Sequence, residues 1–83
     1  MISPKQVHLV RIIVDEIYPE EEIVARFNGY TGMVDFEIML PAPSLDTVST
    51  SADLEGKANK ELVDAIVGAC DELLKLAEEL SGD

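Results

Sequence analysis

The spacing of hydrophobic residues changes twice along this chain, and that change limits the folds it can adopt. Near both ends, apolar side chains recur every three or four residues, whereas in the middle they recur every second residue. The first period is typical of an α-helix and the second of a β-strand. The pattern therefore predicts an α+β fold, a two-layer α-β-β-(β)-α domain in which two helices cover one face of an antiparallel hairpin sheet.

The first helix is predicted from a start signal, a stop signal and one apolar arc. Residues 3–6, Ser-Pro-Lys-Gln, match a capping box with proline at the first helical position. Pro19 disfavours helical backbone at Tyr18, so the helix should end near Ile17. Ile12 is the exception to the apolar arc, because it lies among the polar residues of the opposite side.

Two alternating segments, residues 23–27 and 33–40, flank a glycine-rich turn that contains Asn28-Gly29. This arrangement predicts a β-hairpin. One face of the hairpin is apolar and the other is mixed, so the sheet should be covered on one side only. Residues 45–50 stay open between an edge strand and a loop, because their Thr and Val favour a strand while their Ser and Asp favour a loop.

The last helix is expected to begin between Ala52 and Lys60, to end at Leu80, and to carry two apolar rows. Together the rows span roughly 200° of the helix, more than one sheet needs. The first row has the four-and-three spacing of a heptad seam: Leu62, Ile66, Ala69, Leu73, Leu76 and Leu80. The second row flanks it: Val63, Val67, Cys70, Leu74 and Ala77.

The second apolar row has two interpretations. It packs under the first helix, or it forms a contact with another molecule. A chain of 83 residues buries only ~60–65% of the surface that its unfolded form exposes, and an uncovered apolar row would be a large patch on a monomer. We therefore predict a homodimer, with these contact residues: Ile12, Val63, Val67, Cys70 and Leu74.

Composition narrows the class of protein. The chain is 47% hydrophobic, too apolar for a disordered tail, and its length predicts one domain over residues 1–83. A single cysteine suits a reducing compartment, and the N-terminus lacks the order of a signal peptide. Because the apolar runs are far shorter than the ~20 residues of a membrane helix, we expect a cytoplasmic protein without a membrane partner.

Catalysis, cofactors and metals are not expected. His8 and Cys70 are the only residues of their kinds, and they show no metal-ligand spacing. A nucleophilic cysteine needs a lowered pKa, which the neighbouring acids Asp71 and Glu72 would oppose. We therefore expect a protein that is not an enzyme and that holds no cofactor.

Acidic residues outnumber basic ones by 17 to 6, for a formal net charge of −11. This excess opposes direct binding of nucleic acid, whose affinity comes from Lys and Arg. The bland interpretation is a solvated surface. The sharper hypothesis is an inhibitor that imitates nucleic-acid phosphates and occupies a basic surface of a partner protein. The carboxylates expected on the outer arc of the last helix are Asp64, Asp71, Glu78, Glu61, Glu72 and Glu79.

The predicted order of helices and strands resembles that of the double-stranded-RNA-binding domain. That family contacts phosphates through a basic N-terminus on its last helix. The matching stretch here is residues 56–61, Gly-Lys-Ala-Asn-Lys-Glu, which holds two lysines and is followed by acidic residues. The resemblance implies an alternative function, a divergent RNA-binding-like domain with weak or lost affinity for nucleic acid.

Overall fold

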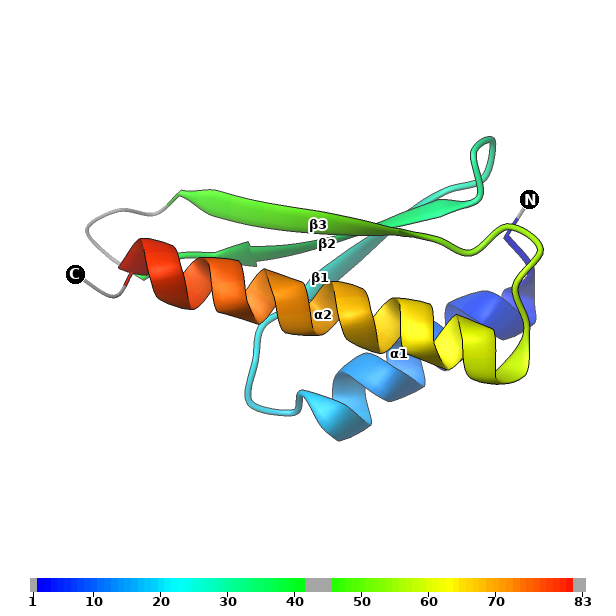
Figure 1. The fold of residues 1–83 in the computed structure, drawn as a ribbon, viewed down its shortest axis with the longest axis horizontal. Helices are drawn as coiled ribbons and strands as arrows, with labels where there is room; N and C mark the ends of the chain where they lie inside the picture. The colour runs from blue at the N-terminus through cyan, green and yellow to red at the C-terminus, as the bar shows by residue number, and fades with distance from the viewer. Residues whose placement is uncertain (1, 42–45, 82–83) are drawn as a thin grey trace.

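In the computed structural model, which describes residues 2–41 and 46–81, the chain runs helix, three strands, helix (Figure 1). The two helices lie on the same side of the strands, and the predicted α+β fold is confirmed. The third strand, which the sequence left open, is present; Leu45 of that open segment lies outside the described residues. The elements are α1 (Pro4–Ile17), β1 (Val24–Asn28), β2 (Met33–Met39), β3 (Thr47–Asp53) and α2 (Asn59–Ser81).

The start of α1 contains the predicted capping box, and one of its residues also contacts the connection between β3 and α2. The Ser3 hydroxyl accepts a hydrogen bond from the Gln6 N–H at 3.3 Å, and the Gln6 side-chain oxygen accepts one from the Ser3 N–H at 2.9 Å. The Gln6 side-chain nitrogen donates to the carbonyls of Leu54, at 2.8 Å, and Lys57, at 3.1 Å. The cap therefore also ties the start of α1 to the connection between β3 and α2.

The hairpin forms as predicted, and its turn depends on Gly32. The Asn28 side-chain oxygen accepts hydrogen bonds from the N–H groups of Tyr30 (2.9 Å) and Thr31 (3.2 Å). Gly32 has a φ of 74°, and a side chain there would collide with Glu55. Left-handed backbone and close packing both favour glycine at this position.

Strand β2 is the centre of the sheet, between β1 and β3, and both of its pairings are antiparallel. The pairing with β3 extends from Met33 opposite Asp53 to Met39 opposite Thr47. Thr50 of β3 faces α2, where its hydroxyl donates a hydrogen bond of 2.8 Å to the Ala69 carbonyl. A Ser- and Thr-rich segment is therefore accommodated as a strand, because β2 pairs its backbone and α2 accepts from its inward hydroxyl.

The core lies between the sheet and the helices. α2 packs on β3 and β2, while α1 packs on α2 and β1. The first apolar row of α2 is buried from Leu62 to Leu73, half-buried at Leu76 and exposed at Leu80. α2 begins at Asn59, at the late end of the predicted range. The largest fully buried side chains are Phe36, Leu54, Ile66, Leu73, Val10, Val34 and Cys70.

Replacing Leu73 with alanine is expected to lower the free energy of unfolding by about 2–5 kcal/mol, because this side chain is 0% exposed and its loss leaves a cavity. Leu80→Ala is the matched control, since Leu80 belongs to the same row but is 63% exposed. The control should change stability by only about 0.5 kcal/mol. Urea unfolding followed by circular dichroism measures both. A Leu73→Ala cost under ~1 kcal/mol would contradict the assigned helical face.

Candidate functional site

The second apolar row of α2 is largely accounted for within one chain. Cys70 is fully buried in the core, so within one chain its side chain presents no surface to a second copy. Val63 and Val67 are half-buried and pack against the core cluster, and the Val67 carbonyl lies 3.4 Å from the hydroxyl of Tyr18 in the residue after α1. Leu74 and Ala77 are half-buried farther along α2, where they line a groove.

The thiol of Cys70 is protected as well as buried. Burial, and then the negative charge of Asp71, raise the pKa of the Cys70 thiol to about 11. At pH 7 that leaves about one thiol in ten thousand ionised, whereas thiol nucleophiles react as thiolates. His8 lies exposed on α1. The two side chains therefore occupy different environments, one in the core and one in solvent.

Tyr18 links α1 to α2, a contact that the sequence analysis did not anticipate. Its side chain is 8% exposed, and its hydroxyl donates to a carboxylate oxygen of Asp71 at 2.6 Å. Its backbone N–H donates to the Val14 carbonyl at 3.1 Å and so caps α1. Burial, together with the hydrogen bond to Asp71 and its charge, raises the pKa of Tyr18 well above its ordinary value of 10.0. Asp71 is therefore a structural partner, not simply a solvated acid.

The six carboxylates predicted on α2 all lie at exposed positions: Asp64, Asp71, Glu78, Glu61, Glu72 and Glu79. We call this set the acidic face of α2. α2 also carries Lys60 and Lys75, so acids outnumber bases three to one on this helix. Of these carboxylates, Asp71 accepts a hydrogen bond from Tyr18, and Glu78 lines the groove described below.

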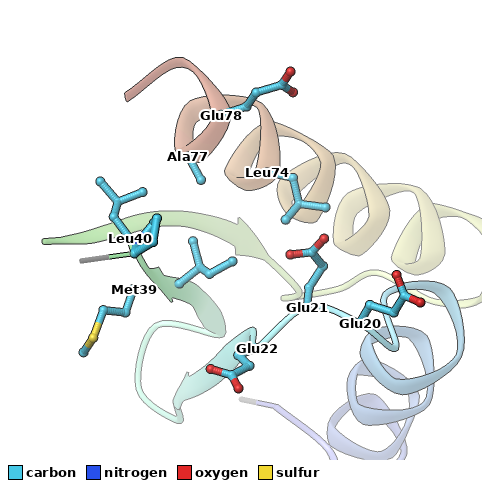
Figure 2. Close-up of a pocket in the computed structure, with 10 residues that line it drawn as sticks. Glu20, Glu21, Glu22, Met39, Leu40, Leu74, Ala77 and Glu78 are labelled. Atoms are coloured by element: carbon cyan, nitrogen blue, oxygen red, sulfur yellow. The ribbon is translucent and has the colours of Figure 1, made fainter. Parts of the chain in front are cut away.

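The groove has a volume of about 870 Å³ and lies between α2, the end of β2 and the α1–β1 connection (Figure 2). In Figure 2, Leu74 and Ala77 project from α2 toward the end of β2, and Glu21 reaches toward Leu74 from the connection. The apolar lining consists of Ile38, Met39, Leu40, Pro41, Leu74 and Ala77. The acidic lining consists of Glu20, Glu21, Glu22 and Glu78.

The groove is electrostatically one-sided. Among the described residues that line it, four are glutamates and none is Lys or Arg. An apolar, low-dielectric floor beside carboxylates of one sign concentrates negative potential. The sequence showed the run Glu20-Glu21-Glu22, but nothing in its local pattern indicated that the fold brings this run beside Glu78.

The described residues were also compared with the requirements of a metal site and of a membrane-spanning helix. Within 2–41 and 46–81, no group of three or more His, Cys, Asp or Glu side chains is placed to hold a metal ion. In the same part of the chain, no helix combines the length and the hydropathy that crossing a membrane requires.

Comparison with known proteins finds no match: no family model fits the chain, and no curated protein or solved structure is significantly similar to it.

Tyr18→Phe is expected to lower the free energy of unfolding by about 1–2 kcal/mol, because it removes the hydrogen bond to the Asp71 carboxylate. Tyr30→Phe is the control, since Tyr30 is fully exposed on the hairpin turn. Above pH 10.0 the cost of Tyr18→Phe should shrink. There the unfolded chain ionises its tyrosine while the folded protein keeps the buried hydroxyl protonated, which lowers the stability of the original protein. Urea unfolding at several pH values checks both effects, and equal costs for the two variants would contradict the linking role.

Proposed function

We propose that this chain is a small, non-enzymatic interaction module that binds a basic protein and blocks its nucleic-acid-binding surface by charge mimicry. The observation that carries the proposal is the acidic face of α2, whose six carboxylates project from a single helix. Residues seven apart on a helix lie roughly 10 Å apart along its axis. Rigid spacing of this kind presents a basic groove with a series of negative charges, as a nucleic acid does.

Long-range electrostatics supports the same function. A formal net charge of −11 on 83 residues attracts a basic partner before contact and raises the association rate. The same negative charge opposes direct binding of nucleic-acid phosphates by this chain. The single thiol, which is buried, is consistent with a cytoplasmic setting, and we include that location in the proposal.

A non-enzymatic role agrees with where the reactive side chains lie. Cys70 is buried with a raised pKa, and His8 is exposed on a different helix. A nucleophile and its base must lie within hydrogen-bonding reach of each other and of a substrate. A thiol enclosed in the core does not offer that arrangement to a substrate.

A specific observation also favours the alternative function. The order α1-β1-β2-β3-α2, with both helices on one side of the sheet, is the order that the resemblance to the double-stranded-RNA-binding domain implies. Lys60 lies in the first turn of α2, and Lys57 lies in the connection just before it, the region where that family contacts phosphates. Glu61 and Asp64 follow directly, and their charge would weaken any such contact.

Reversing two acids of α2 separates these functions. The variant Asp64→Lys with Glu79→Lys should weaken binding to the basic partner by about tenfold or more, chiefly through slower association and with a reduced salt dependence. The alternative function expects tighter binding to duplex RNA, because added positive charge favours phosphates. Asp71 and Glu78 stay unchanged, since one bonds to Tyr18 and the other lines the groove.

The partner is first captured from source lysate with and without nuclease, and affinities for that partner and for a generic RNA duplex are then measured at low and high salt. The control is Asp15→Lys with Glu16→Lys, two exposed acids of α1 that undergo the same change of charge. Equal weakening by both variants would reduce the effect to net charge. Unchanged partner binding by the α2 variant would contradict the proposal.

The homodimer stays a prediction, now without Cys70. It depends on Ile12, which is 42% exposed, and on the half-buried Val63, Val67 and Leu74. Sedimentation equilibrium at micromolar concentration should show about twice the 9.1 kDa mass of the chain, and Ile12→Glu should return it to one chain. A single 9.1 kDa species in the unmodified protein would contradict the prediction.

A further inference from the structure

We infer that the groove beside the C-terminal half of α2 binds a basic amphipathic segment of a protein partner, in which an apolar side chain is flanked by Lys or Arg. This inference rests on the proposed function and names the feature of the basic partner that the protein would recognise. It concerns a surface different from the exposed carboxylates at Asp64 and Glu79, which do not line the groove.

The floor of the groove is suited to apolar side chains. Leu74 and Ala77 are only half-buried against the core, and Ile38 of β2 is half-buried opposite them. Met39 is strongly exposed, but its side chain points away from Leu74 and Ala77, so it borders the groove without forming its floor (Figure 2). Covering this surface would remove apolar area from water, which favours binding. A volume of about 870 Å³ lies within the range of ligand pockets and accommodates several side chains.

The rim comes from two elements that the fold holds together. Glu20, Glu21 and Glu22 belong to the α1–β1 connection, and Glu78 belongs to α2. The Glu21 N–H donates to the Tyr18 carbonyl at 3.1 Å, and the Tyr18 hydroxyl bonds to Asp71 of α2. One residue thus anchors the acidic connection to the helix that forms the opposite side of the groove. The backbone that carries these glutamates is therefore held in place before binding, which lowers the entropy cost of association.

Charge complementarity selects the occupant. A second copy of this chain would bring a further net charge of −11 and the same carboxylates into the groove. Of the dimer contacts that stay predicted, only Ile12, Val63 and Val67, which do not line the groove, are therefore compatible with a basic segment in it. A nucleic acid is repelled because it is also negatively charged. A small hydrated cation gains nothing from contact with the apolar floor. A segment with an apolar side chain between cationic ones satisfies both the floor and the rim, since its Lys or Arg groups reach carboxylates while its apolar group is buried.

The test uses three short fluorescent peptides and the intact chain. One peptide carries Lys and Leu, the second carries the same lysines with Ser in place of Leu, and the third carries Glu and Leu. Fluorescence anisotropy should give a dissociation constant for the Lys/Leu peptide at least about tenfold lower than for the Lys/Ser peptide, because only the first buries apolar area. The Glu/Leu peptide should not bind.

Variants then locate the binding surface. Ala77→Phe should fill the floor and remove most of the preference for the Lys/Leu peptide. Leu74→Ala should weaken that peptide by about two- to fivefold, whereas Leu80→Ala, at an exposed apolar residue of α2 that does not line the groove, should not. Glu78→Gln should weaken it more than Glu79→Gln does, because only Glu78 lines the groove. If Ala77→Phe unfolds the chain, the Leu74→Ala and Glu78→Gln comparisons decide.

The outcomes separate this inference from the proposed function. Equal affinity for the Lys/Leu and Lys/Ser peptides, or a preference that the groove variants leave unchanged, overturns the groove as the binding site. If Asp64→Lys with Glu79→Lys still weakens the captured partner in that case, the proposed function survives without the groove. A failure of the Lys/Leu peptide to bind at all also overturns the inference. A further outcome is that the groove variants abolish the peptide preference while the captured partner binds the Asp64→Lys with Glu79→Lys variant unchanged. That combination of results upholds the groove as a binding site and contradicts the proposed role of the acidic face.

Discussion

Burial of one apolar row of α2 against β2 and β3 is the interaction on which the rest of the structure depends. Ile66 and Leu73 from the helix and Phe36 from β2 are fully buried, and Thr50 donates to a helix carbonyl in the same layer. In a chain of 83 residues there is material for only one such layer. Both helices therefore share one side of the sheet, and the outer arc of α2 is left to solvent, where its carboxylates are stable.

Tyr18 connects this core to the acidic surface on which the proposed function depends. α1 ends at Ile17, and Tyr18 caps it just before Pro19. The ring of Tyr18 is buried, while its hydroxyl donates a hydrogen bond to Asp71. Its carbonyl accepts the Glu21 N–H, so the acidic α1–β1 connection is attached to the same residue. One residue therefore makes both contacts, the core contact through its side chain and the contact with the connection through its backbone carbonyl.

The acidic charge and the apolar groove both fit the same kind of partner, a basic protein segment that carries an apolar side chain. In the proposed function, the acidic face of α2 supplies long-range attraction, which sets the rate of encounter and depends on salt. In the inferred complex, the apolar floor of the groove adds selectivity among basic segments, because burial of an apolar side chain acts only at short range.

Features with a local cause were determined by the sequence alone: the Ser3–Gln6 cap, the end of α1 before Pro19, the hairpin and the buried face around Leu73. Neighbouring residues set backbone preference and hydrophobic period, so short stretches suffice for these elements. Only the tertiary structure decided that residues 47–53 form a strand, that Cys70 is core, that Tyr18 bonds to Asp71, and that Glu20–Glu22 lie across a groove from Glu78. Each of these joins residues far apart in the chain, and hydrophobic period does not specify which distant side chains meet, because that depends on how whole elements pack.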